Sequence, residues 1–144
     1  MKHCFATRGL QVAALLLFFF MAALPLHAED KYEPLPGEGK KVAIGTDYSF
    51  VYKFAQKPAL GISILKIEVA DKDGKKDSSL KITADSGMPS MPGHHDSGEV
   101  EFKKNKEGDY VTPVDVVMPG GWAVKLVFRK DDKVLYRGII SFDI

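Results

Sequence analysis

The sequence predicts a single all-β domain, folded as an antiparallel sandwich of about seven short strands. Apolar and polar residues alternate in several segments, which is the period of a strand that buries one face. Turn residues separate these segments at near-regular intervals. No segment shows the three-and-four spacing of an amphipathic helix. A length of 144 residues suits one such domain.

The expected strands follow one another from residue 48 to the C-terminus. In 62–69 the apolar face switches after Ile64 to Leu65, which predicts a β-bulge or burial on both faces. Pro113 should face outward, as suits an edge strand. Trp122 is expected in the core. The seven segments are 48–54, 62–69, 80–84, 100–102, 110–118, 122–128 and 134–144.

Residues 1–28 have the three-part pattern of a cleaved secretory signal peptide. Lys2 and Arg8 precede an apolar run from Val12 to Leu26, and Ala28 offers a small residue for cleavage. An uncleaved N-terminal anchor is the alternative, although the run is shorter than the ~20 residues that span a bilayer. Residues 29–45, rich in proline and glycine, form a lead-in segment, and 46–144 form the sandwich domain. We therefore expect a periplasmic or secreted protein.

Composition excludes several classes of protein. A formal net charge of +1 argues against a nucleic-acid partner, because phosphate binding needs a basic surface. The one cysteine, Cys4, lies in the signal segment, so the exported domain has neither a disulfide framework nor a thiolate zinc site. His95, Asp96 and Ser97 are neighbours in sequence, which is not how a hydrolytic triad assembles. We expect no enzymatic activity.

The segment 87–95, GMPSMPGHH, gathers the potential soft ligands. Met88-Pro89-Ser90-Met91 suits a type I turn, and the next four residues have Pro second and Gly third, the type II signature. A β-turn brings its first and fourth Cα atoms within ~7 Å. Met88, Met91 and His94 are then within reach of a shared ion, with His95 as an alternate ligand.

Thioether and imidazole donors together suit copper, Cu(I) above all. Met118-Pro119-Gly120-Gly121 is expected to form a third turn of the same kind, which would bring Met118 to the same end of the sandwich. The mechanism would be reversible capture and hand-over of copper by ligand exchange. Because imidazole binds a metal in its neutral form, affinity should fall as the medium acidifies.

A metal-free reading of the same residues stays open. Methionine beside proline and glycine also fills gaps in a packed loop, and adjacent loop histidines are often simply solvated. Met118 lies on the apolar face of its strand, which favours core packing over ligation. Under this reading the loop docks on an envelope or membrane protein, and its shape matters more than its donor atoms.

The order of three motifs resembles the YtkA-like domain family, which is related to FixH-like proteins. These motifs are SGMPSMPGHH, the step Gly108-Asp109-Tyr110, and MPGGW before the last two strands. The resemblance spans roughly 48–144 and implies an immunoglobulin-like sandwich outside the cytoplasm. It also implies copper handling, or assembly of copper-containing respiratory complexes. We expect a copper ion as partner, with an envelope or membrane metalloprotein or an efflux component as candidate protein partners. FixH-like proteins keep a membrane anchor, whereas this chain has a cleavable-looking signal.

Overall fold

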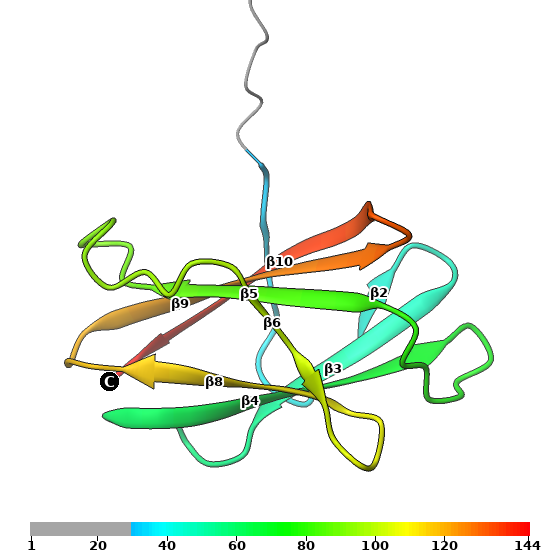
Figure 1. Cartoon of the computed structure of the whole chain (residues 1–144), viewed down its shortest axis with the longest axis horizontal. Helices are drawn as coiled ribbons and strands as arrows, with labels where there is room; N and C mark the ends of the chain where they lie inside the picture. Colours follow the sequence, from blue (N-terminus) through cyan, green and yellow to red (C-terminus); the bar gives the residue numbers. More distant parts are fainter. Residues whose placement is uncertain (1–29) are drawn as a thin grey trace, which may run out of the picture.

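The computed structural model describes residues 30–144, which form two five-stranded sheets packed face to face (Figure 1). The signal peptide predicted over 1–28 lies outside the described residues. All strand pairs are antiparallel except β1 with β10. In spatial order, sheet A contains β1 (Glu33–Pro34), β10 (Lys133–Asp143), β9 (Gly121–Lys130), β5 (Lys81–Gly87) and β6 (Val100–Glu101). Sheet B contains β2 (Val42–Ile44), β3 (Tyr48–Phe54), β4 (Gly61–Asp71), β8 (Tyr110–Val116) and β7 (Lys103–Lys104).

The all-β sandwich is confirmed, with ten strands in place of about seven. The three additional strands, β1, β2 and β7, are two or three residues long, too short for an alternating pattern to identify. The strand predicted at 100–102 is present as β6. Both β1 and β2 lie within 29–45, where they pair with β10 and β3. Over residues 30–144 there is no helix with the length and hydropathy needed to traverse a membrane.

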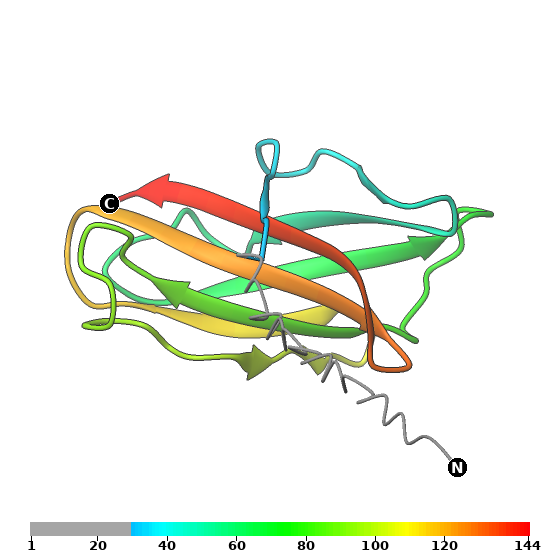
Figure 2. The same cartoon turned by 90° about the horizontal axis from the view of Figure 1, so that it is seen from above.

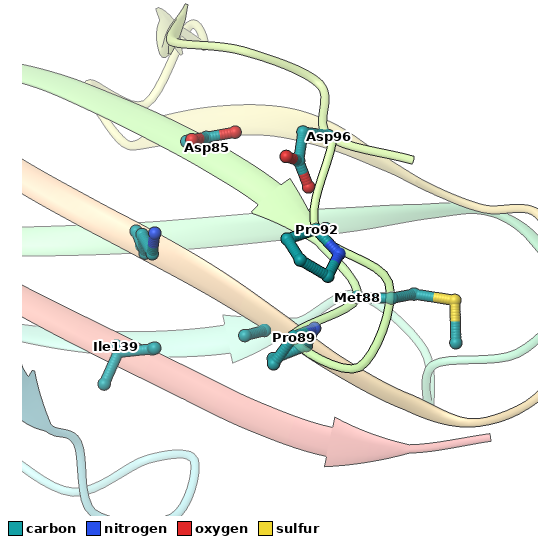
Figure 3. Close-up of a pocket in the computed structure, with 9 residues that line it drawn as sticks. Asp85, Met88, Pro89, Pro92, Asp96 and Ile139 are labelled. Atoms are coloured by element: carbon teal, nitrogen blue, oxygen red, sulfur yellow. The ribbon is translucent and has the colours of Figure 1, made fainter. Parts of the chain in front are cut away.

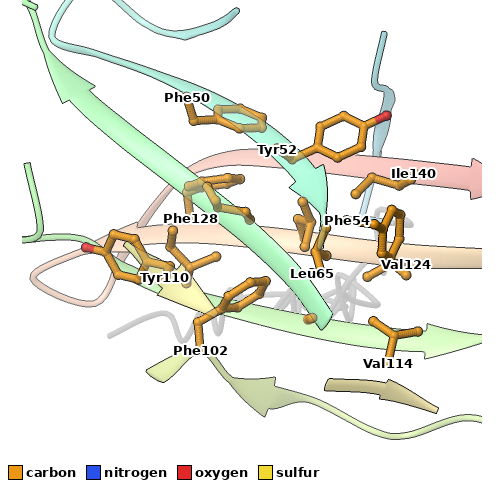
Figure 4. Packing of buried hydrophobic residues seen from close by; sticks show 14 of the residues in the cluster. Phe50, Tyr52, Phe54, Leu65, Phe102, Tyr110, Val114, Val124, Phe128 and Ile140 are labelled. Atoms are coloured by element: carbon orange, nitrogen blue, oxygen red, sulfur yellow. The ribbon is translucent and has the colours of Figure 1, made fainter. Parts of the chain in front are cut away.

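The core lies between the two sheets and is built from the alternating residues of the long strands (Figure 4). Aromatic rings link the sheets: the ring centroids of Phe50 and Phe128 are 4.5 Å apart. Trp122 is 2% exposed, as expected of a core tryptophan. The inward faces predicted for four strands are confirmed by the burial of Phe50, Tyr52 and Phe54; Ile82 and Ala84; Tyr110, Thr112, Val114 and Val116; and Trp122, Val124, Leu126 and Phe128.

Strand β4 differs from its expected geometry. Its register with β3 and β8 runs without a break, so no bulge occurs. Leu65 faces the core, while Ile62 and Ile64 face outward and are 72% and 39% exposed. The prediction of a bulge or of burial on both faces is therefore wrong, because in the described chain no layer covers the outer face of sheet B here. Pro113 does face outward, and β7 pairs with β8 only at Tyr110 and Val111, which leaves an open edge at the proline.

Several connections meet at one end of the sandwich, which we call the methionine end (Figures 1 and 2). It comprises the β3–β4 connection (55–60), the β5–β6 loop (88–99), the β8–β9 connection (117–120) and the C-terminal Ile144. Gly120 and Ile144 exchange two backbone hydrogen bonds of 3.1 Å, which join the β8–β9 connection to the end of the chain. All the methionines of the described chain lie at this end.

Candidate metal site

The β5–β6 loop contains the two consecutive turns that its sequence predicts. The amide of Met91 donates to the carbonyl of Met88 at 2.9 Å, and the amide of His94 donates to that of Met91 at 3.3 Å. Gly93, the third residue of the second turn, has φ of 79°. That value is the positive φ of a type II turn, which glycine adopts without steric cost. Local chemistry therefore decides the path of residues 88–94.

Hydrogen bonds hold this loop against the end of β5. Ser97 donates its amide to the Ser86 carbonyl at 2.8 Å and accepts the Ser86 amide on Oγ at 2.9 Å. Asp96 Oδ2 accepts the Gly93 amide at 2.8 Å. Its Oδ1 occupies the space that a Cβ on Gly87 would need, so the approach requires glycine. The sequence analysis did not predict these contacts of Asp96. Their only signals in the sequence were Gly87 and Asp96 themselves, one at each side of the loop.

Met88 is buried, at 4% exposure, and belongs to the core cluster. Its terminal methyl group lies beside Gly120 of the β8–β9 connection, 2.8 Å from where a Cβ on that glycine would stand. Figure 3 shows its thioether extending away from Ile139 and the outer face of sheet A. The first Met-Pro turn is thus packed directly against the Met118-Pro119-Gly120 segment.

Met118 lies at the methionine end, but its turn is not of the expected kind. A type II turn has φ near 80° at its third residue, whereas Gly120 has φ of 134°. Pairing with Ile144 holds Gly120 in this geometry, because the two residues extend the β9–β10 ladder. The Met118 carbonyl accepts the indole N–H of Trp122 at 3.0 Å. The side chain of Met118 is partly buried against the core, as its place on an apolar face predicts.

The predicted ligands thus divide by exposure. Met91 and Met118 are partly buried and pack on the cluster that contains Met88. His94 is exposed and His95 partly buried. Within residues 30–144, no three His, Cys, Asp or Glu side chains form a group that could hold a metal ion. The donors that the fold gathers at this end are three thioethers and two imidazoles, a set whose softness suits copper better than zinc or calcium.

Apart from these donors, a buried carboxylate lies beside sheet B: Asp109, in the turn before β8, is 1% exposed. Its carboxylate accepts Lys76 Nζ at 2.5 Å and Lys66 Nζ at 2.9 Å. Burial alone would raise the pKa of Asp109, but hydrogen bonds from Lys76, Lys66 and Asn105 outweigh it and lower the pKa to about 2. The ammonium of Lys66 has its own pKa raised by the same bond. This cluster ties β4 and the β4–β5 connection to the turn before β8, which is a structural role.

One comparison with known proteins identifies a family for this chain. The family model described as YtkA-like matches residues 43–127, from β2 into β9 and across the whole candidate site. The searches of curated proteins and of solved structures returned no match. The matched segment covers more than half of the chain and includes the Met-Pro loop, the Gly-Asp-Tyr step and the Met-Pro-Gly-Gly-Trp segment. The chain therefore belongs to the YtkA-like family.

Proposed function

We propose that this YtkA-like domain binds one copper ion at its methionine end, outside the cytoplasm, and hands it over by ligand exchange without catalysis. The observation that carries the proposal is the contact between Met88 and Gly120. It brings two Met-Pro segments, distant in the sequence, to one place. Soft sulfur donors from two loops beside exposed imidazole are what a Cu(I) site needs.

The donors differ in the part that they would play. Met91, Met118 and His94 are accessible enough to meet an incoming ion. Met88 is held beneath them in the core and would offer its sulfur from a fixed position. His95 is an alternate imidazole on the same loop. A bound copper ion would be coordinated by soft ligands that exchange readily. Because several of the donors are partly exposed, the ligands of a partner protein could replace them one at a time.

Titration of the purified protein with Cu(I), in competition with a chromophoric chelator, tests the proposal. Exchange of Met91 and Met118 for Leu together with His94→Ala keeps the apolar bulk and removes three donors. We expect copper affinity to fall by at least about tenfold. Ser90→Ala, in the same loop, is the matched control and should bind as the wild type does. Equal copper affinity in the triple variant and the wild type, with both proteins folded by circular dichroism, would refute the proposal.

A second candidate function is a metal-free interaction module that docks on an envelope or membrane protein. Exposed apolar side chains at the methionine end favour it: Leu60 is 59%, Ile62 72% and Val117 54% exposed. Gly61 pairs with Val116, so these side chains lie together on the outer face of sheet B. If docking is the function, Ile62→Ser should abolish the cellular phenotype that depends on this protein. Met91→Leu should leave that phenotype intact. The copper function requires the opposite outcome.

A further inference from the structure

A cavity of about 320 Å³ lies between the β5–β6 loop and the outer face of sheet A (Figure 3). Met88 also lines the cavity, but the end of its side chain extends away from Ile139 and lies beside Gly120. Pro89 and Pro92 of the loop form one wall, and Ile139 of β10 lies opposite. The volume is that of a small-ligand pocket. The turns and the Ser86–Ser97 hydrogen bonds described above form the pocket without any ligand.

Two carboxylates and one lysine line this cavity beside its apolar residues. Asp85 comes from β5 and Asp96 from the loop, and Figure 3 shows them on the same side of the pocket. Asp85 Oδ1 is buried and has no hydrogen-bond partner among the described residues. A buried carboxylate oxygen without a partner is costly, so a positive charge held in the cavity beside the Asp85 carboxylate would be stabilised.

The lysine that lines the cavity does not fill this role. Lys125 is directly opposite Asp85 in the β5–β9 register and also lines the cavity. Its ammonium, however, lies over the ring of Tyr32, 5.7 Å from the ring centroid. With two carboxylates and one lysine the cavity lining carries a formal charge of −1, which a monovalent cation would neutralise.

We propose that this cavity binds an alkylammonium group, with the charged head at Asp85 and Asp96 and the apolar stem between Pro89, Pro92 and Ile139. Proline and isoleucine side chains match a methylene stem, while the carboxylates supply charge-assisted hydrogen bonds to the head. A free primary amine and the lysine side chain of a partner segment share this chemistry. The proposal is independent of copper and does not rest on the thioethers.

The test is titration of the full-length purified protein with 1-aminopentane, followed by backbone amide NMR shifts, with a chelator present to remove metal ions. A capped tripeptide with a central lysine forms the second arm, and 1-pentanol is the neutral control of equal length. We expect shifts at Asp85, Gly87 and Lys125 with the amine and none with the alcohol. If the peptide saturates the shifts at a lower concentration than the free amine does, the alkylammonium group comes from a lysine of a partner protein. The reverse order would identify a free amine as the ligand.

Two variants with opposite expected effects make the test specific. Asp85→Asn keeps the shape of the side chain and should weaken amine binding by about tenfold, because a charge-assisted hydrogen bond is lost. Lys125→Gln makes the cavity lining more negative by one charge and should strengthen binding. Asp115→Asn, an exposed carboxylate on β8 in the other sheet, is the matched control and should change nothing. Equal amine affinity in wild type and Asp85→Asn, or equal shifts with the alcohol, would overturn the proposal.

Discussion

The terminal methyl group of Met88 lies beside Gly120, so close that a Cβ on Gly120 would stand 2.8 Å from it. This contact joins the β5–β6 loop to the β8–β9 connection, and through Gly120 to the C-terminal Ile144. Three chain segments that are distant in the sequence are thereby packed at the methionine end. The geometry of the proposed copper site and part of the stability of this end depend on the same contact.

Gly120→Ala should destabilise the protein by about 1–3 kcal/mol, mainly because a residue with a Cβ is strained at its φ of 134°. The Met88 methyl would also have to move, which a flexible side chain does at small cost. Chemical denaturation monitored by tryptophan fluorescence measures the change. Gly37→Ala is the control, since a Cβ on Gly37 would have no neighbour within 4 Å and its φ is not positive; it should lie within about 0.5 kcal/mol of the wild type.

Replacements of Met88 should separate packing from ligation. Met88→Ala is expected to lower the free energy of unfolding by about 2–4 kcal/mol, since the side chain is 4% exposed in the core. Met88→Leu conserves volume and should cost less than about 1.5 kcal/mol. If Met88 supplies sulfur to copper, Met88→Leu nevertheless weakens Cu(I) binding. A stable Met88→Leu protein with unchanged copper affinity would restrict Met88 to a packing role.

Acid should weaken the fold through Asp109. Despite its burial, the hydrogen bonds of Lys76 and Lys66 lower its pKa to about 2, against ~3.9 in an unfolded chain. The carboxylate therefore stabilises the folded state at and above about pH 4, by about 2 kcal/mol, and this contribution is lost as the pH falls toward 2. Asp109→Asn lacks it at every pH. The difference in unfolding free energy between wild type and variant should shrink between about pH 4 and 2, whereas Asp115→Asn should show no such trend.

Gly138 of β10 leaves space for the side chain that follows β1, the first strand of the described residues. A Cβ at Gly138 would come within 2.8 Å of the Leu35 side chain, and the Leu35 amide donates to the Ile139 carbonyl at 2.9 Å. Gly138→Ala should therefore loosen β1 from β10 and speed hydrogen exchange at the Leu35 amide by at least about tenfold. In a Leu35→Ala background the same substitution should have little further effect, because the obstructing side chain is gone. Equal acceleration in both backgrounds would locate the strain elsewhere.

Much of the fold follows from residue patterns alone. The alternation of Phe50, Tyr52 and Phe54 identifies an inward face because successive side chains of a strand point to opposite sides. The side chains of β4 alternate as well, but at Ile62 the assumption that an apolar residue faces inward fails, since a β-branched apolar residue suits an exposed strand position as well as a buried one. The short strands β1, β2 and β7 leave no alternating pattern to read. They form because the ends of longer neighbours offer free hydrogen-bonding groups.

The sequence by itself determined the longer strands, the two turns of 88–94 and the types of donor atom, because turn chemistry and strand alternation depend on near neighbours in the chain. The tertiary structure decided that Met88 points into the core beside Gly120, and that the Met118 segment forms no type II turn. It also decided that Asp85 and Asp96 line a cavity on the other side of the loop. Each of these outcomes depends on which distant segment packs against the residue, and no local pattern carries that information.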